Sequence, residues 1–546
     1  MAMRALPSTA DYLIVGGGTS GLVVASRLSE CSASTVVVLE SGPDRNEDPE
    51  VRNPGTWHSL IGSDLDWGFK IVSQPGLNDR SGEHPAGKVL GGSSAINGLA
   101  YAPPSPAGID AWAKLGNPKW DWESFRPYLQ KSYTVTSPNG ISHADNRGQP
   151  KPDAHNIKVT YPALKDKVAS PLLQAWNDAL SAKGYNFNTD ILGEQKTIGT
   201  RAYTATINSD TGLRSSANNE YGAAAVARSN VTIMTEATVH KILFDSTGEN
   251  VTATGAEVTY NGQTATIKAT KEVIMAAGAF HTPKLLELSG IGSKERLIKL
   301  GIPVVIDHPG VGENLQNHLM SIIPAPLNTQ SSLKGIEPGL KALAFVRIDP
   351  REQKELFEAG PELEGASHKA IRSIIQSPNE ASASIVLAAK SSSLALLGAI
   401  TSFPFSRGST HISSKEFDAL PIVDAGFLNN KMDVEILARH VRTIHELTTA
   451  EALKPFFQPS EPVGAPDLQD IKNDLRASAL ATYHTCGTTA MLPRSDCGVV
   501  DQDLTVYGTS NLRIVDAGII PLIPHANPVA TVYAVAERAA DIIRGI

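Results

Sequence analysis

The segment Tyr12-Leu-Ile-Val-Gly16-Gly-Gly18-Thr-Ser-Gly21 decides the fold of this chain. Residues 13–15 have the apolar character of a buried strand, residues 22–28 that of a helix, and residues 35–39 that of a second strand ending at Glu40. Gly16 permits a tight turn, Gly18 lets the backbone approach a pyrophosphate, and Gly21 lets helix and strand pack closely. The helix start attracts phosphate charge, and Glu40 can accept hydrogen bonds from ribose hydroxyls. The combination predicts dinucleotide binding and leaves NAD and FAD open.

Size and composition set broad limits on the class of protein. The 546-residue chain is long enough for two or more domains with their own cores. A net charge of −8 without a long basic run gives no support for nucleic-acid binding, and no apolar stretch has transmembrane length. Three cysteines without a CxxC pair predict neither a disulfide framework nor a metal site.

The compartment is left open by the sequence. Few residues precede the first strand, so we expect no signal peptide, and the chain is either cytoplasmic or a trimmed, secreted form. Asn230 and Asn250 begin glycosylation sequons, which matter only in the secreted case.

Later segments indicate that the first domain is interrupted and then resumed. Residues 53–80 are predicted to be irregular. Strand patterns cover residues 231–236 and 239–244, a meander turns at Asn261-Gly262, and a separate apolar strand is expected at residues 273–278. Residues 511–517 form the last predicted strand, and residues 324–458, which carry no nucleotide motif, are expected to shape the substrate site.

Helical patterns are predicted at several places. Residues 170–183 have helical periodicity, and the tryptophans and Phe125 between residues 110 and 133 are expected to pack helices on the first domain. A helix after residue 278 is predicted to have Thr282 as its N-cap, Pro283 at its first position and Gly290 at its end.

Three stretches together resemble the glucose–methanol–choline (GMC) oxidoreductases, FAD enzymes that oxidise alcohols. The first is residues 87–110, with Gly91-Gly92, Ser93-Ser94, Asn97, Tyr101 and Asp110; the second is residues 278–292. The third combines Tyr483-His484-Thr-Cys-Gly487-Thr488 with Asp516-Ala517 and Asn527-Pro528, and residues 311–318 also match. The resemblance covers nearly the whole chain and points to a fungal aryl-alcohol-oxidase-like or glucose-oxidase-like member.

The resemblance implies an α/β fold, in which a Rossmann-like FAD-binding domain interleaves with an α+β substrate-binding domain built on an antiparallel sheet. It assigns residues 1–60, 85–155, 225–323 and 490–546 to the FAD domain and residues 61–84, 156–224 and 324–489 to the substrate domain. The implied FAD contacts are Gly16, Gly18, Thr19, Ser20, Gly21, Glu40, Gly91, Ser93, Ser94, Asn97, Gly98, Val239, Asp516, Ala517, Pro528 and Val529. Some relatives tether FAD through a histidine before the Asn97 slot, but Ile96 stands here, so non-covalent FAD is expected.

Alcohol oxidation explains the choice of catalytic residues. An alkoxide donates hydride better than a neutral alcohol, so the reaction needs a base near pH 7, and histidine has a suitable pKa. Alone, His484 would more often be structural; the resemblance makes it the base, with hydride passing to flavin N5. Asn527 can be the partner of the alcohol oxygen or merely an N-cap before Pro528. Tyr483 and His525 are expected to line the substrate pocket, and Cys486 to be a small buried residue.

Several functions remain open at this point. The implied activity is oxidation of a primary or secondary alcohol, with O2 or another acceptor reoxidising the flavin. Hydroxynitrile lyases and fatty-acid photodecarboxylases of the same fold are the alternatives. The expected partners are a small alcohol and an electron acceptor, and no motif identifies the alcohol.

Overall fold

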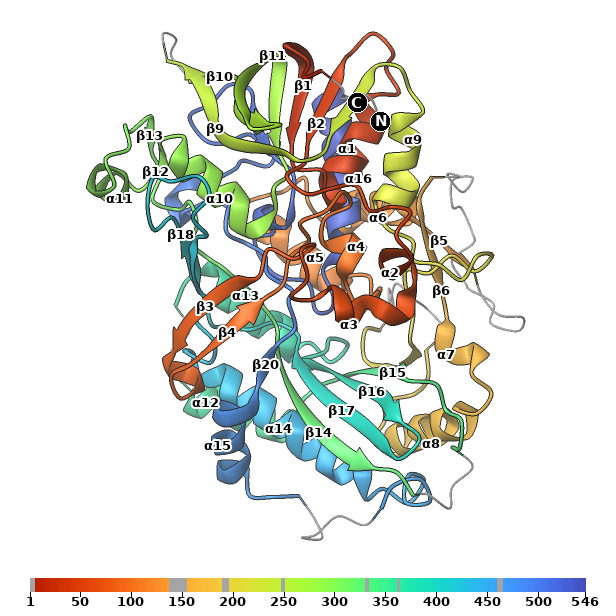
Figure 1. The fold of residues 1–546 in the computed structure, drawn as a ribbon. Coiled ribbons are helices and arrows are strands. Elements are labelled where there is room, and N and C mark those ends of the chain that lie inside the picture. Colours follow the sequence, from red (N-terminus) through yellow and green to blue (C-terminus); the bar gives the residue numbers. More distant parts are fainter. Residues whose placement is uncertain are drawn as a thin grey trace.

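The computed structural model describes residues 5–136, 155–188, 196–246, 251–328, 333–360, 364–458 and 465–546. The second sequon residue, Asn250, lies outside these ranges. Figure 1 shows two main sheets, one near both chain termini and one at the opposite end of the molecule.

The first sheet is built around the predicted strand–helix–strand unit. β1 (Thr9–Val15) pairs in parallel with β2 (Val36–Leu39), and β2 pairs in parallel with β8 (Val231–Met234). Leu13 and Ile14 are fully buried, as expected for a strand covered on both faces. α1 (Thr19–Leu28) follows the glycine turn, so the predicted unit is confirmed, with the helix starting three residues earlier.

The meander that follows contains one strand fewer than predicted. β9 (Ala237–Asp245), β10 (Thr252–Tyr260) and β11 (Gln263–Met275) are antiparallel neighbours. β11 is continuous, so the prediction of a separate strand at residues 273–278 is wrong. The charged residue Glu272 stays within β11 because its carboxylate accepts a hydrogen bond at 2.7 Å from Arg513, which lies on a neighbouring strand of the same sheet. The end of β11 pairs in parallel with both β1 and β21 (Leu512–Ile514), which returns the chain terminus to the first sheet.

Helices pack against this sheet and contribute buried side chains to the same hydrophobic core. α16 (Val529–Arg544) lies beside α1 and α6 (Trp122–Lys131), and the buried Arg27 of α1 binds Glu537 of α16 at 2.7 Å. Trp112 of α5 (Pro106–Lys114) and Phe125 of α6 are fully buried in the same core, which confirms the predicted packing.

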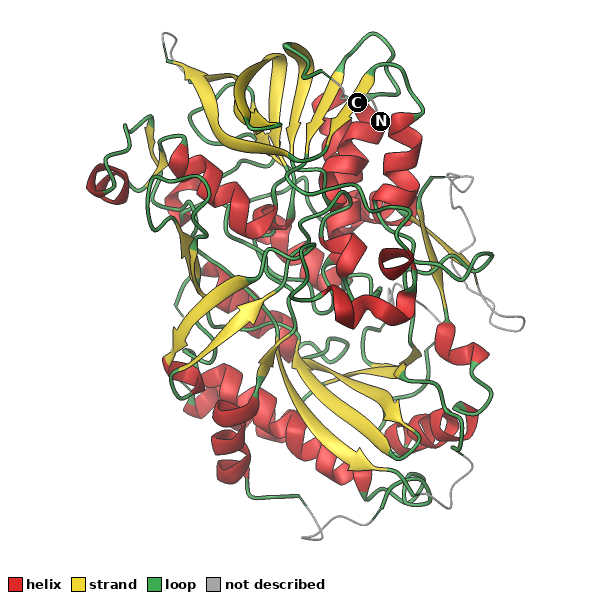
Figure 2. Ribbon diagram, in the orientation of Figure 1, coloured by secondary structure: helices red, strands yellow, loops and turns green. Residues whose placement is uncertain are grey.

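The second sheet is six-stranded in the described residues, with neighbouring strands antiparallel, and helices pack against it (Figure 2). Its order is β20 (Leu480–Ala481), β14 (Leu319–Pro326), β17 (Leu394–Thr401), β16 (Ala383–Ser391), β15 (Gly339–Val346) and β7 (Gly199–Ala202). α14 (Lys431–Thr448) packs on β17, and α8 (Ser170–Ser181), close to its predicted bounds, packs on β15. The architecture confirms the predicted fold class, while the domain boundaries stay a prediction.

Residues 53–80 are more regular than predicted. The remaining elements are α2 (Pro49–Arg52), η1 (Pro54–Thr56), α3 (Trp57–Leu60), β3 (Phe69–Gln74), η2 (Pro75–Leu77), β4 (Arg80–His84), α4 (Ser93–Ile96), β5 (Tyr133–Thr136), β6 (Ile157–Thr160), α7 (Pro162–Lys165), η4 (Asn218–Gly222), α9 (Ala223–Val226), β12 (Ile291–Gly292), α11 (Lys294–Lys299), β13 (Ile306–Asp307), α12 (Pro350–Ala359), α13 (Ala366–Gln376), β18 (Ser409–His411), β19 (Ile422–Asp424), α15 (Leu468–Ser478), η5 (Arg494–Asp496) and η6 (Ala517–Ile519). The side chain of Asn53 caps η1, which explains the ordered start of this region. Within the described ranges, the helices are too short or too polar to span a bilayer.

The start of α10 (Gly278–Leu288) corrects the predicted cap. The helix begins at Gly278, so Thr282 is not its N-cap and Pro283 lies inside it. Proline lacks the N–H that would reach the carbonyl of Ala279. That carbonyl instead accepts a hydrogen bond from Thr488 Oγ1 at 2.6 Å. A distant side chain therefore makes the internal proline tolerable.

Candidate active site

Backbone pairing brings the predicted base next to a second histidine. β20 pairs with the start of β14, and beyond these strands Gln316 and Cys486 exchange backbone hydrogen bonds. The segments 316–320 and 480–486 therefore run antiparallel, side by side. His318 and His484, 166 residues apart in sequence, face each other with 2.9 Å between their Nδ1 atoms.

The two ring nitrogens of His484 have different partners. Nδ1 lies 2.9 Å from both His318 Nδ1 and Thr482 Oγ1. Nε2 lies 2.9 Å from Nδ2 of Asn527, and the backbone N–H of His484 donates to Asn317 Oδ1. The imidazole is thus held from three directions, with Nε2 turned toward the asparagine.

Electrostatics keep these histidines neutral. Burial lowers the pKa of His484 well below its ordinary value, and the neighbouring His318 and His84 lower it further. Burial likewise lowers the pKa of His318 to about 4 and that of His84 to about 4. A neutral imidazole has one free lone pair, so His484 can accept a proton at neutral pH.

Asn527 does not cap the last helix. α16 begins at Val529 with Pro528 at the N-cap position, and no side chain caps it. The amide of Asn527 instead binds His484, although the two residues come from separate segments. The structure therefore contradicts the N-cap role of Asn527, and its contact with the alcohol oxygen stays a prediction.

The glycines of the first motif form a tight cradle. A Cβ on Gly16 would lie 2.3 Å from the carbonyl oxygen of Ala276, and one on Gly21 would lie 2.0 Å from that of Gly16. Gly18 stands at the N-cap of α1 and therefore offers no capping side chain. Gly92, at φ +53°, packs so close to Gly18 that a Cβ would come within 2.7 Å of its Cα. A bare helix N-terminus between two close glycine turns fits a dinucleotide phosphate.

The acidic residues of the predicted cofactor site already bind backbone groups. Glu40 accepts hydrogen bonds from the N–H groups of Gly17 and Gly42 at 2.8 Å, and burial raises its pKa to about 7. Asp516 accepts from the N–H groups of Gly278 and Gly518 and from the hydroxyl of Thr282, while burial raises its pKa. Asp516 thus joins the start of α10 to the segment after β21.

The second glycine-rich stretch is also tied to its surroundings. The N–H of Gly91 donates to the carbonyl of Gly17 at 2.8 Å, which joins the two glycine turns. Ser94 Oγ donates to the carbonyl of Gly91, and Asn97 Oδ1 accepts from the buried Arg214 at 2.8 Å. The hydroxyl of Ser93 accepts from Gly87 and the carbonyl of Gly98 accepts from Tyr203. These hydrogen bonds fix the shape of the loop beside the first glycine turn.

The other predicted cofactor residues lie on four segments. Thr19 and Ser20 form the first turn of α1, and Val529 the first turn of α16, which packs on α1. Val239 lies in β9, whose first residue donates its N–H to the carbonyl of Glu40. The carbonyl of Ala517 accepts the N–H of Gly487, three residues after His484. Backbone hydrogen bonds therefore connect β9 to Glu40, and Ala517 to the segment that carries His484.

The two predicted substrate-lining residues differ in exposure. Tyr483 has φ +64° and is 45% exposed, and its ring lies nearly perpendicular to that of His84, with 5.4 Å between the ring centroids. His525 is buried against Phe345, and neither of its ring nitrogens has a partner among the described residues. Cys486 is fully buried, which confirms that prediction.

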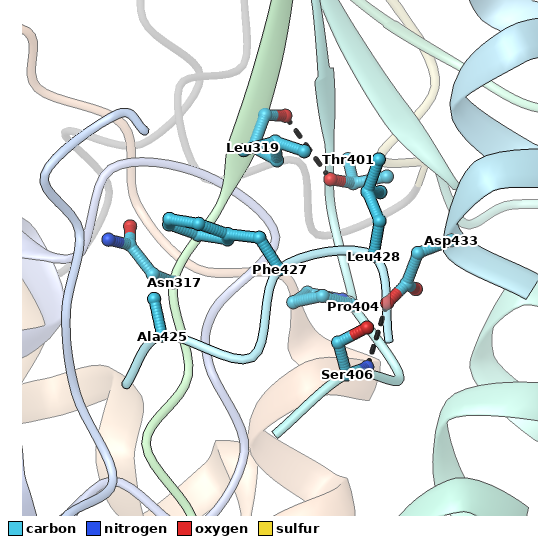
Figure 3. Close-up of a pocket in the computed structure, with 9 residues that line it drawn as sticks. All are labelled: Asn317, Leu319, Thr401, Pro404, Ser406, Ala425, Phe427, Leu428 and Asp433. Carbon is cyan, nitrogen blue, oxygen red and sulfur yellow. Dashed lines mark hydrogen bonds between the residues drawn. The ribbon is translucent and has the colours of Figure 1, made fainter. Parts of the chain in front are cut away.

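A small pocket beside the segment 316–320 does not contain the catalytic candidates. Figure 3 shows its lining: Asn317, Leu319, Thr401, Pro404, Ser406, Ala425, Phe427, Leu428 and Asp433. Asp433 accepts the N–H groups of Phe405 and Ser406 at 2.7 Å, and Thr401 donates to the carbonyl of Leu319. Among the residues that line the pocket, Asn317 belongs to the candidate site, because its Oδ1 accepts a hydrogen bond from the backbone N–H of His484.

Sequence reasoning missed the residues that hold His484. His318 lay in a stretch that resembled the family, but no role was predicted for it, and neither Thr482 nor Asn317 was singled out. The contacts of His318 and Asn317 with His484 arise from the pairing of segments about 165 residues apart, whereas Thr482 lies two residues before His484. No local pattern signals such a pairing.

Comparisons with known proteins agree with the fold and identify the family. Two sequence models described as GMC oxidoreductase match residues 10–320 and 404–536. A GMC oxidoreductase family protein of Malassezia sympodialis, Mala s 12, is 34% identical over an alignment that covers 98% of this chain and 92% of that protein.

Solved structures give the same result. An FAD-dependent oxidoreductase from Chaetomium thermophilum superposes with a TM-score of 0.86 at 27% identity, covering 98% of this chain and 99% of that one. A fungal aryl-alcohol oxidase superposes with a TM-score of 0.84 at 28% identity, with the same coverage of both chains.

Proposed function

The chain belongs to the GMC oxidoreductases, FAD-dependent enzymes that act on CH–OH groups, and we propose that it oxidises a primary or secondary alcohol to the carbonyl compound. His484 is the general base and Asn527 binds the alcohol oxygen. The observation that carries this proposal is the 2.9 Å contact between Nε2 of His484 and Nδ2 of Asn527. A proton acceptor and a hydrogen-bond donor lie side by side there, and an alcohol hydroxyl that entered between them would meet both.

The residues divide the reaction into two tasks. The alcohol hydroxyl gives its proton to Nε2 of His484, and the amide N–H of Asn527 donates a hydrogen bond to the oxygen as negative charge develops there. Bound FAD supplies the oxidant that takes the hydride from the alcohol carbon. One proton and one hydride leave the alcohol, so the product is the carbonyl compound, and O2 or another acceptor completes the cycle.

The cofactor is proposed to bind non-covalently. The pyrophosphate would lie on Gly16, Gly18 and the start of α1, and Glu40 would meet the ribose. Ile96 stands where some relatives carry the tethering histidine, and its alkyl side chain is buried beside Val89 in a small apolar cluster. Such a side chain has no nucleophile with which to bond the flavin.

An acid-precipitation experiment tests the mode of cofactor binding. Precipitation of the yellow holoenzyme should leave the colour in the supernatant, where FAD is identified by mass. Colour that remains with the washed pellet would show a covalent bond and contradict this part of the proposal.

The catalytic proposal is tested by anaerobic flavin reduction. Purified holoenzyme is mixed with aliphatic alcohols, sugars and aryl alcohols, and bleaching of the flavin identifies the substrate class; admitting air then reports oxygen reactivity. His484→Ala should bind FAD normally but reduce it about 10²–10⁴-fold more slowly. His525→Ala, made in parallel, should stay within a few-fold of the wild type.

Two results would contradict the proposal. If no alcohol bleaches the flavin while a cyanohydrin is cleaved, the enzyme would not be an alcohol oxidase. If His525→Ala is inactive and His484→Ala is active, the base has been assigned to the wrong histidine.

A further inference from the structure

We infer that His318 is a positioning residue that fixes which ring nitrogen of His484 carries hydrogen, and so leaves Nε2 free to act as the base. This inference rests on the proposed role of His484 and adds the residue that prepares it. The two rings are nearly perpendicular, with an interplanar angle of 88°, and meet through their Nδ1 atoms.

The hydrogen on His318 is located by its other partner. Nε2 of His318 lies 3.0 Å from the carbonyl oxygen of Ser402. A carbonyl oxygen can only accept, so Nε2 of His318 must be the N–H donor. Burial lowers the pKa of His318 to about 4, so near neutral pH the ring carries only that one hydrogen. Its Nδ1 is therefore a lone pair directed at His484.

The hydrogen on His484 follows from this lone pair. Two lone pairs 2.9 Å apart would repel each other, so Nδ1 of His484 must carry the hydrogen that joins the rings. Thr482 Oγ1 can accept from the same N–H, because its own hydrogen is donated to the carbonyl of His318 at 3.0 Å. Nε2 of His484 is then unprotonated.

The opposite side of the ring agrees with this assignment. Nε2 of His484 faces the amide nitrogen of Asn527, which can only donate. The series of hydrogen bonds from the Ser402 carbonyl through His318 and His484 to Asn527 thus alternates donors and acceptors without conflict. The Ser402 carbonyl at one end and the Asn527 amide at the other require the same tautomer of His484.

The titratable side chains that act on His484 are the neutral His318 and His84. His318 in turn acts on the buried His525, whose pKa the cation of Arg201 also lowers. The carbonyls of Ser402 and Pro524 also face His318. A neutral acceptor such as His318 orients His484 without the rise in pKa that a carboxylate would cause. The base therefore stays unprotonated over a wide pH range.

A matched pair of substitutions tests the inference. In His318→Asn, the amide oxygen can occupy the place of Nδ1 and still accept from His484. In His318→Gln, the longer side chain places its amide near the Nε2 position, so it keeps the bond to Ser402 and loses the acceptor. Both variants are loaded with FAD, and the flavin-reduction rate is measured between pH 5 and 10 together with thermal melting.

We expect His318→Asn to reduce its flavin within a few-fold of the wild type. His318→Gln should be slower by about 10- to 100-fold. A wrong histidine tautomer can cost about 10⁴-fold in hydrolases, but Thr482 remains here as a second acceptor. If both variants reduce the flavin at the same rate, or if their rates differ only as their melting temperatures do, His318 has a structural role and the inference is wrong.

A direct measurement on the wild-type holoenzyme does not depend on the folding of a variant. With ¹⁵N-labelled histidine, ring nitrogen shifts distinguish the tautomers, and we expect hydrogen on Nδ1 of His484 and on Nε2 of His318. The opposite pattern would overturn the inference. A fully active His484→Ala would instead refute the proposed function, so the two failures are distinguishable.

Discussion

Asn527→Asp should raise the proton affinity of His484, the proposed base. The substitution puts a carboxylate where the amide nitrogen now lies 2.9 Å from Nε2 of His484. Unit charges about 4 Å apart attract by about 1 kcal/mol in water and about 4 kcal/mol at an effective dielectric constant of 20. Both side chains are partly buried, so about 2–3 kcal/mol is expected.

This attraction raises the proton affinity of His484 about 30- to 150-fold. The pKa of His484 in the wild type is well below its ordinary value because of burial, so the base is neutral near pH 7. In the variant the pKa rises, and the acid limb of flavin reduction should move to higher pH. Part of the loss should persist at high pH, because a carboxylate cannot donate to the alcohol oxygen.

The assay is stopped-flow reduction of the bound flavin by alcohol under anaerobic conditions, from pH 5 to 10. Thermal stability should change little, since Asn527 does not cap α16. Asn527→His is the companion variant, and it should retain some activity because its ring can also donate. An Asn527→Asp enzyme with the wild-type rate and pH profile would refute the reasoning.

Two further predictions concern the frame around the site. In Gly21→Ala, the new Cβ would lie 2.0 Å from the carbonyl oxygen of Gly16, so the amount of FAD retained and the melting temperature should both fall, with a stability loss of about 1–3 kcal/mol. Gly82→Ala is the control, because a Cβ on Gly82 would meet nothing within 4 Å. Equal melting temperatures of the two variants would contradict the tight packing at Gly21. Burial lowers the pKa of His411, but hydrogen bonds to Glu287 and Glu313 raise it more, so its net pKa is raised. Its stabilisation is therefore full below pH 6.5 and lost as the pH rises through the folded pKa. Between pH 6 and 8.5 the wild type should lose about 1 kcal/mol more stability than His411→Gln, measured by denaturant unfolding, and parallel curves would contradict this.

Features of the first strand–helix–strand unit could be predicted because their causes are local. Gly16 and Gly21 are needed where the backbone turns or approaches another segment of the chain, and such steric needs can be read from the glycine spacing. The apolar run before them similarly predicts a strand buried on both faces. The family signatures extended this to the fold class and to His484 and Asn527 as candidates.

Where local patterns failed, a distant residue had changed the outcome. Thr282-Pro283 has the pattern of a helix start, but Thr488 satisfies the carbonyl that the proline leaves free, and Thr282 bonds Asp516. The charged interruption in β11 reads as a break between strands, but Arg513 holds Glu272 within the sheet. In each case the compensating side chain lies more than 200 residues away in sequence.

By itself, the sequence determined the dinucleotide turn, the alternation of strands and helices, and the residue types available for alcohol oxidation. Only the tertiary structure decided that Asn527 binds a histidine instead of capping α16, and that His318 lies against His484. Glycine spacing and helix signals act through steric and dipolar effects over a few residues. The orientation of a ring nitrogen depends on strand pairing across 166 residues, and on which distant carbonyl receives its hydrogen.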